Sequence, residues 1–179
     1  MRLMLSIMYC LLVLCAACTN TRLNQVPQVP QATALKHQEK ILIVLPADGR
    51  HGDKVYVDSG RYIAEKIKEH LALYSRQVNI TGSTLNADQA LAEAKSASYR
   101  YLFIPRIQNW EPRASSWSGR PGRASVLMSV YDLAAEPSLV NTTLLEAQGK
   151  SYHTETPEYL MDRLIKEFLA SVYRPTSPK

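Results

Sequence analysis

All three cysteines of this chain lie within its first eighteen residues, and this placement constrains the fold more than any other sequence feature. Arg2 precedes an apolar run over residues 3–17, and polar residues follow directly after Cys18. Such a run is typical of a cleaved export signal and is shorter than the ~20 residues that a membrane-spanning helix needs. The domain behind it therefore has no disulfide and no thiol chemistry, and it must fold on its hydrophobic core alone.

The end of this run, residues 14–18 (LCAAC), resembles the lipobox of bacterial lipoproteins. The resemblance implies cleavage between Ala17 and Cys18 and a diacylglycerol on the Cys18 thiol. Cys15 departs from the usual pattern, because that family has leucine there; a plain cleaved signal and an uncleaved anchor are the alternatives. Thr19 stands where an inner-membrane retention signal would have aspartate. The resemblance thus implies a protein anchored by lipid to the outer membrane and facing the periplasm.

Cleavage leaves 162 residues, the size of one domain, with 20 Lys and Arg against 16 Asp and Glu and a net charge of +4. An exported chain rarely meets nucleic acid, so we expect this mild excess to serve solubility or to meet anionic headgroups and cell-wall polymers. Residues 18–38 are rich in Asn, Gln, Thr and Pro without a periodic apolar face, which predicts a flexible tether. Residues 39–174 form the predicted globular domain, and residues 175–179 a disordered tail.

The spacing of apolar residues predicts one α/β (α+β) domain with the element order β-α-β-α-β-β-β-α. A continuous apolar run at residues 41–45, closed by Pro46, predicts a strand buried on both faces. Helix starts are predicted at Ser59, Asn86 and Thr156. Further strands are predicted at residues 77–81, 99–107, 124–133 and 139–149. We therefore expect a mixed sheet of about five strands with three helices packed on it.

Two strands carry more specific expectations. Residues 124–133 alternate, so Ala124, Val126, Met128 and Val130 are expected on one face and the residues between them on the other. Pro105 cannot donate to a β-ladder, so the far half of the strand at 99–107 is expected to bend or to lie at an edge. An unpaired edge there is a candidate surface for self-association.

One candidate site is the polar loop that follows the first predicted strand. A strand end followed by a helix start is where α/β proteins often bind ligands. The candidate residues are Asp48, Gly49, His51, Asp53, Ser59 and Gly60. The loop has neither a P-loop nor a dinucleotide fingerprint, and the four histidines form no i, i+4 pair, so we expect no cofactor and no metal. A structural turn and an envelope enzyme or ligand-binding domain with His51 as acid–base both stay open.

A second candidate site is the loop over residues 108–123, which holds both tryptophans and three arginines. Trp and Arg are enriched at binding hot spots because they bury large areas and donate hydrogen bonds at their tips. The rings either staple the loop to the sheet, with Glu111 pairing with an arginine, or form a surface for an envelope protein or a cell-wall polymer. The candidate partner-binding residues are Trp110, Glu111, Arg113, Trp117, Ser118, Gly119 and Arg120.

The WE-x-R-x-x-x-WSG run in this loop and the earlier P-x-DG and DSG segments (46–49 and 58–60) resemble the small bacterial lipoproteins of domain of unknown function 4823. The similarity extends from about Ile41 to Val172. In that family an aspartate often follows the proline after WSG, whereas Gly122 follows Pro121 here. The family has no established activity, so the resemblance implies a lipoprotein and a fold but no catalytic residue. The resulting hypothesis is a non-enzymatic binding or accessory module.

Overall fold

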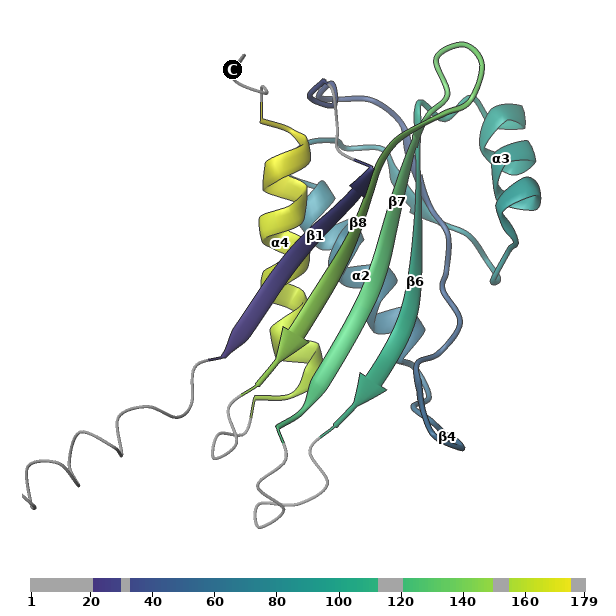
Figure 1. Cartoon of the computed structure of the whole chain (residues 1–179). Coiled ribbons are helices and arrows are strands. Elements are labelled where there is room, and N and C mark those ends of the chain that lie inside the picture. Colours follow the sequence, from purple (N-terminus) through teal and green to yellow (C-terminus); the bar gives the residue numbers. More distant parts are fainter. Residues whose placement is uncertain (1–20, 30–32, 113–120, 150–154, 175–179) are drawn as a thin grey trace, which may run out of the picture.

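The computed structural model describes residues 21–29, 33–112, 121–149 and 155–174, and its centre is a six-stranded sheet in the order β1-β8-β7-β6-β2-β5 (Figure 1). The strands of this sheet are β1 (Arg22–Val29), β2 (Ile41–Ile43), β5 (Val78–Ile80), β6 (Tyr101–Glu111), β7 (Arg123–Asp132) and β8 (Ser138–Gln148). The helices are α2 (Ser59–Leu71), α3 (Ala87–Ser96) and α4 (Pro157–Val172), and β3 (Arg50–His51) and β4 (Lys54–Val55) form a small separate hairpin. The predicted mixed α/β class is confirmed, although the sheet has six strands instead of about five.

The connections of the parallel strands put helices on both sides of the sheet. β2 is next to the edge strand β5 and runs parallel to β5 on one side and to β6 on the other, while the remaining neighbours are antiparallel. The chain moves outward from β2 to β5 through α2 and then back past β2 to β6 through α3. Because crossovers of parallel strands keep one hand, opposite directions of travel place α2 and α3 on opposite faces.

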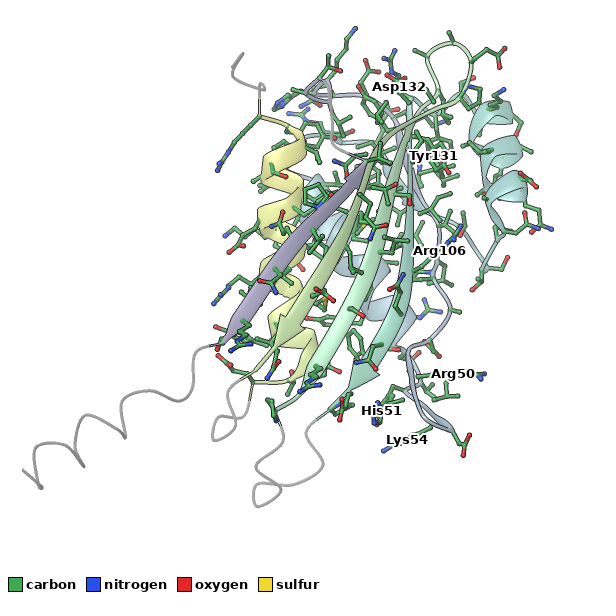
Figure 2. The ribbon with its side chains drawn as sticks, in the orientation of Figure 1. Arg50, His51, Lys54, Arg106, Tyr131 and Asp132 are labelled. Atoms are coloured by element: carbon green, nitrogen blue, oxygen red, sulfur yellow. The ribbon has the colours of Figure 1, made fainter. Side chains whose placement is uncertain are left out.

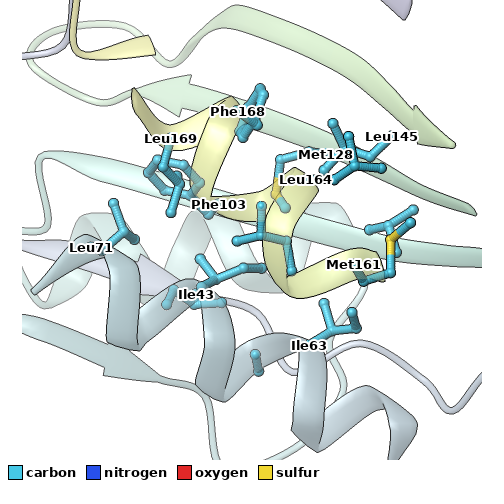
Figure 3. Close-up of a cluster of buried hydrophobic side chains, with 14 of the residues drawn as sticks. Ile43, Ile63, Leu71, Phe103, Met128, Leu145, Met161, Leu164, Phe168 and Leu169 are labelled. Atoms are coloured by element: carbon cyan, nitrogen blue, oxygen red, sulfur yellow. The ribbon is translucent and has the colours of Figure 1, made fainter. Parts of the chain in front are cut away.

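The main hydrophobic core lies between the sheet and the helices α2 and α4 (Figure 3). Val126, Met128 and Val130 of β7 are fully buried there and Ala124 is 2 % exposed, so the predicted inward face of this strand is confirmed. Leu164 and Phe168 of α4 meet Phe103 of β6 in the same cluster. A smaller cluster on the other face packs α3 against Leu42, Val44, Leu102 and Ile104.

Two of the three predicted helix starts have the expected caps. The Asn86 side chain accepts the Gln89 N–H while Gln89 reaches back, forming a capping box, and the Thr156 hydroxyl accepts the Tyr159 N–H. The prediction that Ser59 caps α2 is wrong. Asp58 holds the cap position instead, with φ of 67° and no side-chain cap bond. The Ser59 hydroxyl accepts the Gly49 N–H and donates to the Tyr56 carbonyl, so it does not cap the helix.

Pro105 lies where the sheet can accept a residue without an N–H group. β2 pairs with β6 only from Tyr101 to Phe103, and the Val44 N–H still reaches the Phe103 carbonyl at 2.9 Å. Backbone groups two residues apart in a strand point to the same side, so the Pro105 nitrogen, like the Phe103 carbonyl, faces the β2 side. It lies just beyond the end of β2, where no ladder bond is lost. The far half of β6 pairs with β7 but, in the described part of the chain, with no strand on its β2 side, as the sequence predicted.

The predicted tether over residues 18–38 is wrong for most of its described length. Residues 22–29 form β1, which pairs antiparallel with β8. Leu35 is 5 % exposed, and its N–H bonds the Val172 carbonyl at 2.9 Å. Backbone pairing along an open sheet edge needs no side-chain periodicity, so Asn, Gln and Pro in this stretch concealed the strand.

Candidate functional site

Two of the segments that carry the family resemblance, residues 46–49 and 58–60, meet in one structural junction. The Gly49 N–H donates to the Ser59 hydroxyl at 2.8 Å, and that hydroxyl donates to the Tyr56 carbonyl at 2.6 Å. The Gly60 N–H donates to Asp48 Oδ1 at 2.9 Å. These bonds tie the strand end after β2 to the first turn of α2, so four of the six candidate ligand-loop residues hold the fold together.

The glycines of this junction are required by close packing. A Cβ on Gly49 would lie 2.5 Å from the Trp110 Cβ, and a Cβ on Gly60 would collide with the Pro46 carbonyl oxygen. Trp110 itself is 1 % exposed and belongs to the main core. The Trp110 ring therefore packs the end of β6 into the core beside Gly49, where it is not exposed to a partner.

The remaining loop residues, His51 and Asp53, lie on the β3–β4 hairpin and are exposed (Figure 2). The hairpin turn places Gly52 at φ of 57°, a conformation that only glycine adopts freely. Gly52-Asp53 between two strands is a hairpin signal that was present in the sequence. His51 Nε2 lies 3.6 Å from Glu111 Oε1, with half of the His51 side chain exposed. Glu111 thus faces the hairpin, and Arg113, Trp117, Ser118, Gly119 and Arg120 lie outside the described residues.

Titratable side chains meet between α2 and α4. His70 Nε2 lies 2.9 Å from Asp162 Oδ1, and Lys66 Nζ lies 3.7 Å from the same oxygen. Burial raises the pKa of the Tyr62 hydroxyl, and the Asp162 carboxylate raises it further. The hydroxyl donates to the Glu158 carbonyl at 2.9 Å, so the cluster joins the two helices rather than facing a substrate cleft. In the described ranges, no three His, Cys, Asp or Glu side chains are placed to hold a metal ion.

A large feature that the sequence did not reveal is an uncovered sheet face, the part of the side opposite α2 and α4 that α3 leaves open over β1, β8 and the far parts of β7 and β6. Figure 1 shows these strands in front of α2 and α4, with α3 displaced to one side. The register places Val26, Leu144, Leu127 and Arg106 in one row across the four strands. Val26 is 44 % exposed, and Leu144 and Leu127 are half-buried. No described helix packs on this side of β1 and β8, so these apolar side chains face outward.

A polar groove of about 300 Å³ is hollowed into the uncovered face next to this apolar row. Its side chains come from the next two rows of the ladder, and a strand's alternation directs them all outward. They are Arg22, Asn24, Asn109, Arg123, Ser125, Glu146 and Gln148. Guanidinium, amide and carboxylate groups can exchange many hydrogen bonds with a polar partner, which makes the groove a polar border to the apolar row.

A second groove of about 320 Å³ lies just beyond the end of β2, beside the middle of β6, between Pro46, Leu85 just before α3, and Pro105. This is the position where an open α/β sheet of this strand order places a ligand. Its lining is mainly apolar, with Arg106 and Asn86 among the polar members. The sequence analysis put the candidate ligand loop just beyond this groove, at residues that the structure uses in the junction.

The chain belongs to the family Domain of unknown function (DUF4823), whose profile matches residues 33–172. Its fold is also that of PelC from Paraburkholderia phytofirmans, solved as a dodecamer, with a TM-score of 0.64, 17 % identity and coverage of 88 % of this chain and 100 % of that one. Lipoprotein GNA1162 from Neisseria meningitidis is similar at a TM-score of 0.48 and 10 % identity, covering 75 % of this chain and 97 % of the other. No curated relative matches the chain. Among the described helices, none has the length and apolar character to cross a bilayer.

Proposed function

We propose that this chain is a lipid-anchored, non-enzymatic accessory lipoprotein that assembles with further copies of itself on the periplasmic face of the outer membrane. The signal sequence and the predicted acylation at Cys18 support the anchor. The uncovered sheet face supports the assembly, because an outward apolar row on the face of a sheet marks an interaction surface. The family to which the chain belongs is described as a domain of unknown function, so family membership names no activity for the chain.

The single observation that carries the proposal is the row formed by Val26, Leu144 and Leu127. These side chains lie opposite one another on adjacent strands, so together they make one continuous apolar stripe. The polar groove borders the stripe along one side, which gives an apolar row with a polar rim, as found in protein interfaces. A second copy is the proposed occupant, because a protein of the same fold, PelC, was solved as a dodecamer.

The open edge of β1 lies beside the same stripe. β1 pairs with β8 on one side, and in the described part of the chain no strand pairs with its other side. Edge strands offer free N–H and C=O groups to another chain. Pro27 and the irregularity between Pro27 and Val29 interrupt this edge, which limits pairing to part of the strand and leaves the stripe as the main contact.

The test is the molecular mass of the acylated protein in detergent, measured by light scattering for the wild type, Val26→Asp and Leu73→Asp. Val26 lies on the stripe, whereas Leu73 is 72 % exposed just beyond α2 and serves as the matched control. We expect an oligomer for the wild type and Leu73→Asp, and a smaller species for Val26→Asp with an unchanged circular dichroism spectrum. A monomeric wild type at all concentrations, or an intact Val26→Asp oligomer, would contradict the proposed surface.

A second proposed role concerns the Trp/Arg loop. Trp117 and Arg120 remain candidates for contact with an envelope protein or a cell-wall polymer, because the sequence concentrates Trp and Arg there and, of the two tryptophans, Trp110 is buried in the core. The test compares Trp117→Ala/Arg120→Ala with wild type in cross-linked envelope pull-downs and in thermal unfolding. A partner lost at unchanged melting temperature would support the role, whereas a full partner set with a lower melting temperature would leave only a structural one.

A further inference from the structure

The start of β1 leaves almost no free chain between the lipid anchor and the folded domain. β1 begins at Arg22, four residues after the predicted acylation site Cys18. A chain spans at most 3.3–3.6 Å per residue, so Arg22 lies within about 14 Å of the acylated residue. A tether of the predicted length would have allowed roughly 20–25 Å and free rotation of the domain. The anchor therefore constrains which end of the sheet faces the membrane.

The ladder shows which structural elements share that end. Arg22 lies opposite Gln148, Gln148 opposite Arg123, and Arg123 opposite Glu111, so β1 and β7 begin where β8 and β6 end. The contact between His51 and Glu111 adds the β3–β4 hairpin to this end. Figure 2 shows Arg50, His51 and Lys54 at one end of the molecule and Tyr131 and Asp132 near the other.

The side chains at this end suit the surface of a bilayer. Val55 and Val57 next to the hairpin are 40 % and 78 % exposed, and Tyr159 in the first turn of α4 is 58 % exposed. Exposed apolar groups and tyrosine beside basic residues are the composition found at the headgroup level of membranes. Among the described residues, the charged groups at this end include the basic Arg22, Arg50, Lys54 and Arg123 and the acidic Asp53, Glu111, Glu155 and Glu158. Because both signs are present, the proposed contact rests on the short anchor and the apolar side chains.

We infer that this end of the sheet, led by the β3–β4 hairpin, rests on the phospholipid headgroups of the membrane that holds the anchor. The inference depends on the proposed acylation of Cys18. An eleven-residue strand such as β6 spans about 35 Å, so the β7–β8 turn stands about that far from the bilayer surface. The polar groove with Arg22 and Arg123 then opens beside the headgroup layer. The apolar stripe, which runs across the strands, lies parallel to the bilayer surface and faces a neighbouring copy along the membrane.

The absence of cysteines beyond Cys18 allows a direct measurement. Asp53→Cys in the hairpin turn and Glu136→Cys in the β7–β8 turn each add one reactive thiol at an exposed position. Each acylated variant is labelled with a fluorophore and reconstituted into vesicles of phosphatidylethanolamine and phosphatidylglycerol that contain a headgroup-linked energy acceptor. We expect strong energy transfer from position 53 and at least several-fold weaker transfer from position 136. Equal or reversed transfer would overturn the orientation.

Two controls separate this inference from the anchor on which it depends. Mass spectrometry of each variant reports acylation of Cys18, and an unmodified Cys18 would contradict the anchor, whatever the energy transfer. Insertion of ten Gly and Ser residues between Asn20 and Thr21 lengthens the free chain to an average span of roughly 20 Å. We expect this insertion to lower the transfer from position 53. Unchanged strong transfer with the long linker would refute the short anchor as the cause of the orientation.

Discussion

The two faces of the β1–β8–β7–β6 sheet differ in what they bury, although the same strands supply both. On the face under α2 and α4, Val126 and Met128 are fully buried, whereas Leu127 between them lies half-buried on the uncovered face. The first face supplies the hydrophobic free energy of the fold. The second face supplies little of it and remains open to a partner. Substitutions on the two faces should therefore separate stability from assembly.

The largest expected effect comes from Trp110→Ala on the covered face. Trp110 is 1 % exposed and packs against Gly49, so its removal leaves a cavity that costs about 3–5 kcal/mol of unfolding free energy. Urea denaturation of the monomer measures this loss. Leu139→Ala, at a 40 % exposed position, is the comparison. A similarly small loss in both variants would show that Trp110 contributes no more to the free energy of unfolding than a surface residue does.

Gly49→Ala should have the next largest effect. It tests the contact between Gly49 and Trp110 from the Gly49 side. The added Cβ would meet the Trp110 Cβ at 2.5 Å, and we expect a loss of about 1–3 kcal/mol from overpacking. Gly82→Ala is the matched control, since a Cβ there meets nothing within 4 Å and its φ is not positive. We expect it to be neutral or to stabilise by up to about 1 kcal/mol. Equal effects would show that the junction tolerates a side chain.

Tyr173 belongs to the core on the covered face, and its buried hydroxyl makes the stability of this face depend on pH. Burial raises the pKa of its hydroxyl above the ordinary value in the folded protein. This raised pKa contributes stability that is fully present below the unfolded-state pKa of about 10 and is lost as pH rises beyond it, by about 1.4 kcal/mol per pH unit. We expect Tyr173→Phe to lose less unfolding free energy than wild type between about pH 9 and 11. Identical losses in urea titrations at both pH values would contradict the buried hydroxyl.

The smallest effect on folding is expected on the uncovered face. Val26→Asp places a charge at a 44 % exposed edge position, so the monomer should change by less than about 0.5 kcal/mol. Denaturation at a protein concentration where wild type is monomeric measures this change. Together with a smaller oligomer, it would show that the face serves assembly. A loss above about 2 kcal/mol would instead make the uncovered face part of the folding core.

Local signals in the sequence were sufficient to predict an element where one of its faces is buried. The alternation of β7, the capping box of α3 and the Thr156 cap of α4 all appear as predicted. Apart from the short β3–β4 hairpin, the element order from β2 to α4 was likewise predictable. β1 could not be recognised, because it is held mainly by backbone pairing with β8 and because its apolar residues do not alternate with polar ones along the sequence. The β3–β4 hairpin carried a Gly-Asp signal but was too short for a strand pattern.

The candidate site shows the same limit. The segments at 46–49 and 58–60 and Trp110 could be singled out in the sequence, yet their meeting in one junction follows from the crossover between β2 and α2. Whether Trp110 binds a partner or the core depended on which side of β6 it faces after the irregularity between Ile107 and Asn109. A one-residue shift reverses the face of every following side chain, so composition alone could not decide it.

The sequence by itself determined that residues 19–179 hold no cysteine and that the elements follow an α/β order, because composition, hydropathy and periodicity are local properties of the chain. Only the tertiary structure decided that Arg22–Val29 is a strand, so that β1 begins four residues after Cys18, and that one sheet face has no described helix over β1 and β8. These features depend on which distant backbones pair and which face each helix covers. Such contacts arise from the folded chain as a whole, and no single segment encodes them.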